Sequence, residues 1–281
     1  MQKGCYGKMG PLGFHVDGEP RTLCAGGEPL ARILPGPSPV VALALHAGHA
    51  VRSELAPYLA ISEDDRLREE DPLTARMAPD GITRIEVLRS RFEIDLNRPR
   101  FRAVYQGPDD AWGLPLYNDD LPDRIDRVSR AVHDAFYAQA HAILSQVAQV
   151  YGRFVVLDLH SYNHRRGGAE APAAPVAENP EVNLGTGRLD RRLWAPVVEE
   201  FSAVMNGGGF DCRENVRFRG GHFARWVVET FPGTGAALAI EFKKTYMDEW
   251  SGEADDAAIE RIRATLEATV PALTSALDRL A

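Results

Sequence analysis

Runs of consecutive apolar residues recur along the chain between longer polar segments. The clearest runs cover residues 40–45, 154–159 and 236–242. Short runs that are rich in β-branched residues and do not alternate with polar positions are typical of strands buried on both faces of a sheet. We therefore expect these runs to form the core strands. Weaker strand patterns cover residues 83–88, 92–96, 182–187 and 216–222.

Helical patterns separate these runs. The longest covers residues 122–150, where Ile125, Val132 and Phe136 belong to an apolar series at helical spacing. Ser62 is a candidate N-cap of a further helix. The alternation of helices with buried strands predicts an α/β fold. Other helices are expected over residues 191–205, 223–229 and 255–280.

Length and composition fit one globular unit. The chain has 281 residues, of which 44% are hydrophobic, an ordinary fraction for a globular protein. It shows no internal repeat and no convincing linker, so we expect a single domain over residues 1–281. Residues 1–39 are rich in Gly and Pro. They are expected to form an irregular lead-in, with short strands near residues 14–16 and 32–34.

Charge, hydropathy and cysteine content narrow the class of protein. The formal net charge of -8 argues against a nucleic-acid binder, because such domains carry a basic face. No apolar stretch is long enough to span a bilayer, and the N-terminus has no signal-peptide pattern. Cys5, Cys24 and Cys212 are scattered and indicate neither a disulfide framework nor a CxxC metal site. We therefore expect a cytoplasmic location and no nucleic-acid or membrane partner.

Two of the predicted strands end on histidine. Residues 40–45 lead to His46, and residues 154–159 lead to His160, with Asp158 two positions before it. Ligands of open α/β sheets sit at the carboxyl ends of strands. The two histidines are therefore candidate ligands of one metal ion, and Asp158 is a candidate to orient the His160 imidazole.

A zinc site would need a third protein ligand, because catalytic zinc is held by histidine and carboxylate groups with one position left open. The acids Glu69, Glu70 and Asp71 follow in the next polar segment, and His49 is an alternative. Pro72 biases Asp71 towards an extended conformation, which would hold its carboxylate in a defined direction.

Other charged residues are candidates for binding the substrate or for transferring a proton. Glu241 lies near the carboxyl end of the strand at residues 236–242, where a general base would be useful. Arg98 follows Asn97 in a segment dense in charge, and an arginine fork binds carboxylates with two parallel hydrogen bonds. A substrate carboxylate is the favoured partner of Arg98, and an internal pair with Asp95 is the structural alternative.

Together these motifs resemble the N-formylglutamate amidohydrolase family, which belongs with the zinc-carboxypeptidase-like hydrolases. The resemblance implies an α/β fold with a mixed, mainly parallel central sheet flanked by helices, of the zinc-carboxypeptidase-like (phosphorylase/hydrolase-like) kind. The matching stretches occur in the family's order: LHAG at residues 45–48, LREED at 67–71, SRFEIDLNRP at 90–99, LDLHS at 157–161 and AIE at 239–241.

The resemblance also implies a single Zn²⁺ held by His46, His160 and an acid, either Glu70 or Asp71. His49 departs from the family's pattern and keeps the third ligand open. The implied roles of the remaining residues are general base for Glu241, catalytic help from Arg91, and substrate binding by Asn97, Arg98, His222 and His49.

The expected function is a zinc-dependent amidohydrolase that cleaves the amide bond of an N-formyl or N-acyl amino acid such as N-formylglutamate. The alternatives are a zinc carboxypeptidase acting on a peptide terminus and a non-catalytic carboxylate-binding protein of the same fold. In each case the partner is a small molecule or peptide with a free carboxylate. The long loop over residues 162–180 is a candidate lid. The sequence carries no signal for an oligomeric state.

Overall fold

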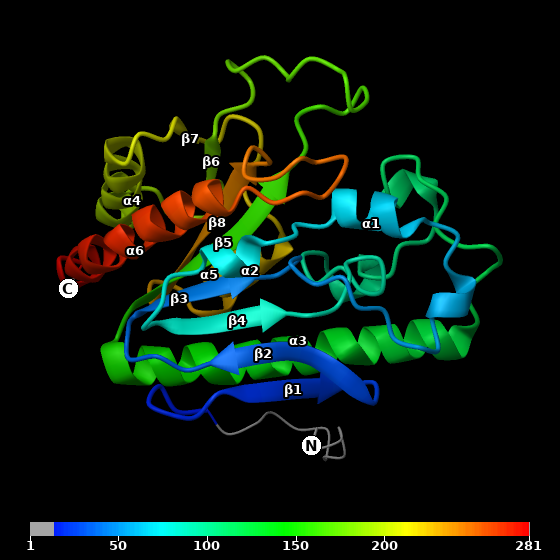
Figure 1. Ribbon diagram of the computed structural model, residues 1–281. Helices are drawn as coiled ribbons and strands as arrows, with labels where there is room; N and C mark the ends of the chain where they lie inside the picture. Colours follow the sequence, from blue (N-terminus) through cyan, green and yellow to red (C-terminus); the bar gives the residue numbers. More distant parts are fainter. Residues whose placement is uncertain (1–13, 281) are drawn as a thin grey trace.

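One mixed sheet runs through the centre of the molecule (Figure 1). The structure is a computed structural model that describes residues 14–280. Within this range eight strands pair in the order β1-β2-β4-β3-β5-β8-β6-β7. The strands are β1 (Arg21–Ala25), β2 (Glu28–Leu34), β3 (Val40–Ala44), β4 (Thr83–Val87), β5 (Phe154–Tyr162), β6 (Val182–Gly185), β7 (Cys212–Glu214) and β8 (Gly235–Lys243).

The middle of this sheet is parallel. Strands β4, β3, β5 and β8 run in the same direction, whereas β2 pairs antiparallel with β4 and β6 pairs antiparallel with β8. The predicted fold class, a mixed and mainly parallel sheet flanked by helices, is therefore confirmed. The predicted core strands at residues 40–45, 154–159 and 236–242 correspond to β3, β5 and β8.

Helices cover both faces of the sheet. Their bounds are α1 (Glu63–Glu69), α2 (Thr74–Met77), α3 (Asp123–Tyr151), α4 (Ala195–Gly207), α5 (His222–Thr230) and α6 (Asp256–Asp278). Helices α3 and α5 pack into the cluster on one face, and α2, α4 and α6 pack into the cluster on the other. Figure 1 shows the long helix α3 on one side of the strands and α4 with α6 on the other. Three short 3-10 helices are η1 (Ala56–Tyr58), η2 (Arg100–Arg102) and η3 (Pro108–Asp110).

Alternation along each central strand divides its side chains between the two clusters. In β3, Val41 and Leu43 belong to the α3 side, whereas Val40 and Ala42 belong to the α6 side. Every residue of β3 is buried. A strand covered on both faces needs apolar side chains at all positions, which explains the unbroken apolar runs in the sequence.

Two of the strands predicted after residue 39 are absent. Residues 92–96 form turns, because the backbone N–H groups of Glu93 and Ile94 donate to Ser90 O. The apolar side chains of this segment point into separate clusters, with Phe92 in one and Ile94 in another. The apolar residues at 92–96 are therefore buried in a folded loop and do not form a strand of the sheet. The strand expected over residues 216–222 is also wrong, since the strand here is β7 and the chain leaves it at Asn215, whose φ is 56°.

The irregular lead-in expected over residues 1–39 is wrong from residue 21 onwards. Strands β1 and β2 pair as an antiparallel hairpin that closes on Gly26 and Gly27, both of which have positive φ. The short strand expected near residues 32–34 is part of β2, whereas the described residues near 14–16 form no strand. Cys24 is disulfide-bonded, which differs from the expectation of no disulfide, and Cys212 is a buried free thiol.

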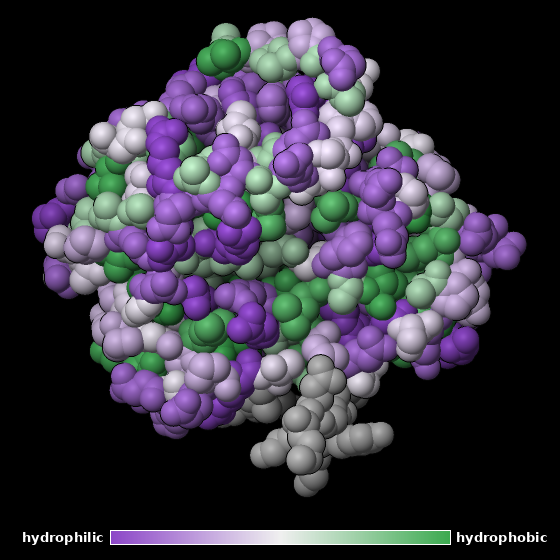
Figure 2. Space-filling view, in the orientation of Figure 1, coloured by the Kyte–Doolittle hydropathy of each residue, from purple (hydrophilic) through white to green (hydrophobic). Residues whose placement is uncertain are grey.

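Hydrophilic residues cover much of the face shown in Figure 2, with hydrophobic residues interspersed among them. Within residues 14–280, no helix has the length and apolar character that crossing a membrane would require.

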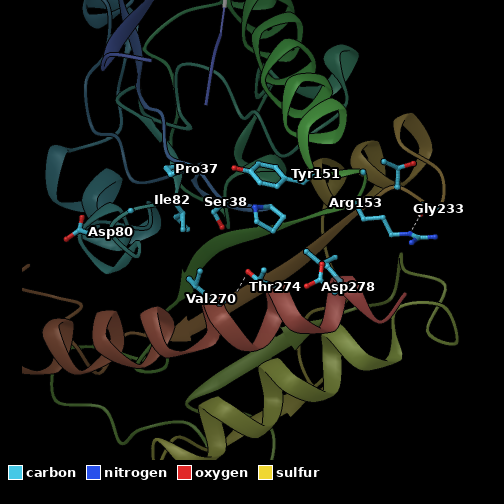
Figure 3. A pocket seen from close by; sticks show the side chains of 15 residues that line it. Pro37, Ser38, Asp80, Ile82, Tyr151, Arg153, Gly233, Val270, Thr274 and Asp278 are labelled. Atoms are coloured by element: carbon cyan, nitrogen blue, oxygen red, sulfur yellow. Dashed lines mark hydrogen bonds between the residues drawn. The ribbon is translucent and has the colours of Figure 1, made fainter. Parts of the chain in front are cut away.

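A large cavity of about 770 Å³ lies at the amino ends of the parallel strands. Figure 3 shows Ser38, Arg153 and Gly233 around it, from the segments that enter β3, β5 and β8. None of the candidate site residues from the sequence lines this cavity. Candidate residues such as His160 and Glu241 lie at the opposite edge of the sheet, near the carboxyl ends of the parallel strands.

Candidate metal centre and active site

The candidate residues meet at the carboxyl edge of the parallel strands. His46 follows the last residue of β3 by two positions, and His160 lies near the end of the neighbouring strand β5. Glu241 is the register partner of His160 on the adjacent strand β8. Asp71 comes directly after α1 and Glu70, and its backbone N–H donates to His46 O at 3.0 Å. Sheet order therefore assembles four residues that lie far apart in the sequence.

His46, Asp71 and His160 form a compact group of buried ligand atoms. One ligand atom from each residue lies within 4.8 Å of the others. Asp71 Oδ2 is 3.3 Å from His46 Nδ1 and 3.0 Å from His160 Nδ1. Both imidazoles thus present the same ring nitrogen to the same carboxylate oxygen.

The other ring nitrogen of each histidine faces a second carboxylate. His46 Nε2 is 2.8 Å from Asp95 Oδ1, and His160 Nε2 is 3.0 Å from Asp158 Oδ1. A carboxylate accepts hydrogen bonds and does not donate them when ionised. These contacts therefore favour the proton on Nε2 and leave the Nδ1 lone pair of each ring free.

The arrangement fits a bound cation. Two Nδ1 lone pairs and one carboxylate oxygen converge in a buried site, and His46 Nδ1 has no hydrogen-bond partner there. Buried acceptors without a donor are costly, and a metal ion would satisfy all three. Two histidines and an aspartate leave room for a water or substrate oxygen, as catalytic sites require.

Asp71 and the two histidines stabilise one another's charged forms. Burial disfavours the ionised form of Asp71, but the nearby His160 and His46 outweigh it and hold the pKa of Asp71 well below its usual range. Burial also disfavours protonated His160, yet Asp158 and Asp71 raise the pKa of His160 well above its usual value. For Glu241 burial dominates and raises the pKa to about 7.

These residues open into a cavity of about 270 Å³. It contains seven of the candidates from the sequence, which come from α1, β5, β8 and the segments after β3, α1 and β4. The seven are His46, Glu69, Asp71, Arg91, Asn97, His160 and Glu241. The remaining lining residues are Trp112, Ser161, Tyr162, Asn163, Arg166, Phe218, Arg219, Gly220, Gly221 and Lys244.

The sequence profile of the N-formylglutamate amidohydrolase family matches residues 38–247. The chain belongs to this family. The match spans every residue of the metal centre and confirms the resemblance inferred from the motifs. No curated protein matches the chain.

Solved structures support the same fold for this family member. The N-formylglutamate amidohydrolase from Ralstonia eutropha JMP134 aligns with a TM-score of 0.68 at 16% identity, covering 89% of this chain and 99% of that one. A gene product from Agrobacterium tumefaciens aligns with a TM-score of 0.59 at 16% identity, covering 89% and 94%. A metallo-carboxypeptidase from Burkholderia cenocepacia aligns at 0.38 with 16% identity, covering 94% and 66%.

Glu70, which the sequence left as an alternative to Asp71, binds Ser90 and His49 instead of the two candidate histidine ligands. Its Oε1 accepts a short hydrogen bond from the Ser90 hydroxyl, and its Oε2 is 2.6 Å from His49 Nδ1. Neither Glu70 nor His49 lines the cavity. Of the two acids, Asp71 is therefore the one whose carboxylate lies beside both histidines, whereas Glu70 is bound by His49 outside the cavity.

Arg98 and His222 also lie outside the cavity lining. Arg98 donates to Asp110 Oδ1 at 2.6 Å and to Asp110 O at 2.8 Å, and its guanidinium lies over the Tyr105 ring. His222 begins α5 and its ring packs near His133, at 6.4 Å between centroids. Neither side chain therefore lines the cavity that holds the metal centre.

Asn97 and Arg91 face the cavity from the loop after β4. Asn97 Oδ1 accepts from Phe223 N at 3.0 Å. Arg91 donates to Tyr105 Oη at 3.0 Å and to Asp95 Oδ2 at 3.2 Å. Burial opposes its charge, but Tyr105 and Asp95 raise the pKa of Arg91 above its ordinary value. The Arg91 guanidinium is therefore a fixed positive charge.

Sequence reasoning missed several contributors. Asp95 was considered as a partner of Arg98, whereas it also orients His46. Lys244 is not among the candidates from the sequence, yet it is buried and donates to Arg68 O and Glu70 O. Burial lowers the pKa of Lys244 to about 8. A lysine that directly follows a core strand was the one available signal, and it did not reveal this contact.

Proposed function

We propose that this chain is a zinc-dependent amidohydrolase that cleaves the amide bond of an N-formyl or N-acyl amino acid with a free carboxylate. The observation that carries the proposal is the convergence of His46 Nδ1, His160 Nδ1 and Asp71 Oδ2 beside Glu241. Membership of the N-formylglutamate amidohydrolase family supports the reaction class.

In the proposed reaction His46, Asp71 and His160 would hold the ion. Zn²⁺ held there would supply Lewis acidity for the amide carbonyl and for a water molecule. Glu241 would accept a proton from that water and later give it to the leaving nitrogen. Water is consumed, the carbon–nitrogen bond breaks, and a carboxylic acid and an amine are released.

Arg91 and Asn97 would act on the substrate oxygen atoms. Negative charge develops on the carbonyl oxygen as water attacks, and a fixed cation in a site sheltered from water stabilises such charge. The Arg91 guanidinium is held by Tyr105 and Asp95 before the reaction begins, so it would not need to reorganise. The Asn97 amide would add a hydrogen-bonding group beside it.

Cavity size favours a small substrate. The cavity volume of about 270 Å³ is slightly below the range of roughly 300–1,000 Å³ that is typical of ligand cavities. A formylated or acetylated amino acid fits this volume better than a peptide chain. We therefore prefer an N-acyl amino acid to a peptide terminus.

Metal content is the first test of the proposal. We expect purified wild-type chain to carry near-stoichiometric zinc after zinc is offered, measured by plasma mass spectrometry. His160→Ala should lose it, whereas His141→Ala, which changes an exposed histidine of α3, should keep it. Wild-type chain that binds no metal would sink the catalytic proposal and leave a carboxylate-binding protein.

A second test separates the general base from the ligands. Glu241→Gln keeps the size of the side chain but removes its capacity to accept a proton. We expect kcat for N-formyl-L-glutamate to fall by roughly 10²- to 10⁴-fold while zinc content stays unchanged. Loss of zinc in Glu241→Gln would instead assign Glu241 to the metal.

A further inference from the structure

Four cationic side chains line the cavity that holds the metal centre: Arg91, Arg166, Arg219 and Lys244. An unpaired guanidinium can offer both of its terminal nitrogens to a substrate carboxylate, whereas a cation that is already bound to a protein oxygen has fewer free N–H donors. The contacts of these four side chains therefore decide which of them is available.

Three of the four are engaged. Arg91 donates to Tyr105 and Asp95, as described above. Arg166 donates to both carboxylate oxygens of Glu69, at 3.1 and 3.0 Å. Lys244 donates to two backbone carbonyls at the end of α1. Each of these three cations therefore already shares its charge and part of its N–H donors with protein oxygens.

Arg219 differs from the other three. Within residues 14–280, no carboxylate or carbonyl lies within bonding distance of its guanidinium, and its side chain is exposed. The side chain crosses Gly187, where an added Cβ would lie 3.1 Å from Arg219 Nε. Arg219 thus brings an unpaired positive charge to the wall of the cavity.

The backbone that carries Arg219 is held firmly in place. Asn183 is fully buried in β6, and its Oδ1 accepts from Arg217 N at 2.7 Å and from Phe218 N at 3.2 Å. Its Nδ2 donates to Phe218 O at 2.9 Å. Arg219 O accepts from Gly187 N at 2.9 Å. The position of the Arg219 backbone relative to β8 and Glu241 is therefore set by the sheet, because Asn183 is the register partner of Glu241.

We propose that Arg219 receives the carboxylate of the substrate, in place of Arg98. Arg98 was the expected carboxylate-binding residue, but it is paired with Asp110 and lies outside the cavity lining. An arginine fork holds a carboxylate with two parallel hydrogen bonds. Arg219 is then the residue that sets the preference for an anionic substrate. This inference rests on the proposed amidohydrolase function.

The kinetic test compares Arg219→Gln with Arg188→Gln. Arg188 is also exposed and lies nearby, since an added Cβ on Gly220 would be 3.8 Å from its Cγ, but it does not line the cavity. For N-formyl-L-glutamate we expect Arg219→Gln to raise KM roughly 10- to 100-fold, as loss of a charge-assisted hydrogen bond does, with kcat changed by less than about threefold. Arg188→Gln should match wild type, and Arg219→Lys should recover part of the loss. Equal KM values for Arg219→Gln and Arg188→Gln would overturn the proposal.

Substrate analogues identify the carboxylate. Glutamate has an α-carboxylate and a side-chain carboxylate, and either could pair with Arg219. N-formyl-L-glutamine lacks the second, and the α-amide of N-formyl-L-glutamate lacks the first. The analogue that has lost the contacted group should be insensitive to Arg219→Gln, whereas the other should keep the full rise in KM. Equal sensitivity of both analogues would mean a general structural role and would contradict the proposal.

A binding measurement separates this inference from the proposed function. Calorimetric titration of glutarate into zinc-treated protein needs no turnover. If wild type binds glutarate and Arg219→Gln binds it at least about tenfold more weakly, the carboxylate site stands even if no amide is cleaved. If amides are cleaved but glutarate binding and KM ignore Arg219→Gln, the amidohydrolase stands and the Arg219 assignment fails.

Discussion

A second carboxylate orients each of the two candidate histidine ligands. Each imidazole faces a carboxylate through Nε2, Asp95 for His46 and Asp158 for His160. This contact sets the tautomer and the direction of the ring, and it raises the basicity of the nitrogen that would bind metal. The pair of buried carboxylates is therefore as much a part of the centre as the ligands.

Asp158→Asn tests this role at a single atom pair. Asparagine keeps the shape of the side chain but removes its negative charge beside His160 Nε2. We expect zinc affinity, measured by competition with a chelator, to fall roughly 10- to 100-fold. Asp134→Asn, which changes an exposed partner of Arg100, should leave affinity unchanged. An unaltered affinity in Asp158→Asn would show that the ring is oriented by other contacts.

Contacts of single residues also distinguish Glu70 from Asp71, the two acids between which the sequence left the choice open. Glu70 and Asp71 are neighbours of the same charge, and local sequence favours neither strongly. Ser90 and His49 bind Glu70, so Asp71 alone remains to face the histidines. The decision came from residues about 20 positions away in the chain.

At the scale of elements, the loop after β4 includes residues 92–96, which were expected to form a strand. It passes between two helices that hold its carbonyls. Tyr137 of α3 donates to Leu96 O at 2.7 Å, and His222 N of α5 donates to Asn97 O at 3.3 Å. The loop thereby carries Asn97 to the metal centre with a defined orientation.

Gly221→Ala tests how closely α5 must approach this loop. An added Cβ would lie 2.4 Å from both Asn97 Nδ2 and Asn97 Oδ1, so the Asn97 side chain would have to move. We expect a loss of about 1–3 kcal/mol in the free energy of unfolding and a lower kcat/KM. In the control Gly207→Ala, the added Cβ meets nothing within 4 Å. Equal stability and activity in the two variants would argue against a fixed Asn97.

The contact between α3 and α5 should make stability depend on pH. Burial lowers the pKa of His133, and burial together with the nearby His133 and Arg225 lowers the pKa of His222. Below pH about 6.5 the unfolded chain therefore binds more protons than the folded chain, and the free energy of unfolding falls as pH falls.

His133→Gln isolates this effect. Denaturant unfolding of wild type at pH 7.5 and 5.5 should show a larger loss of stability than His133→Gln shows over the same interval. His141→Gln, at an exposed position of the same helix, should behave as wild type. A wild-type loss that persists in full in His133→Gln would place the dependence elsewhere.

At the scale of the whole molecule, the sheet separates two edges with different contents. The carboxyl edge gathers His46, His160 and Glu241 from three neighbouring strands or their ends. The amino edge carries the larger cavity of Figure 3 but none of the candidate site residues. Cavity size alone would therefore point to the amino edge, whereas the chemistry of the lining residues points to the carboxyl edge as the candidate active site.

A metal ion held at the carboxyl edge should stabilise the whole fold. His46, Asp71 and His160 come together only in the folded chain, so zinc would bind the native state far better than the unfolded state. At 100 times the dissociation constant this adds about 2.7 kcal/mol, which for a large domain raises Tm by roughly 2–4 °C per kcal/mol. We expect thermal scans of chelator-treated wild type to shift upwards on adding zinc. His160→Ala should show no shift, and the same shift in both would assign the zinc to another site.

Much of the fold could be predicted because burial leaves a local record. Strands β3, β5 and β8 must be apolar at every position that meets helices on both faces, and α3 repeats its apolar residues at helical spacing over eight turns. The same signal misled at residues 92–96, since a buried loop needs apolar residues too. Hydrophobicity alone does not distinguish a strand from a loop that crosses the core.

The sequence by itself determined the fold class, the family and the residues from which a metal centre would be drawn, because strand ends and short motifs are local features. Only the tertiary structure placed Asp71 and not Glu70 beside the histidines, turned Arg98 towards Asp110, and left Arg219 at the cavity without a partner among the described residues. These outcomes depend on which charged groups meet across long sequence separations. A charged side chain in isolation suits many partners, and the packed chain selects one of them.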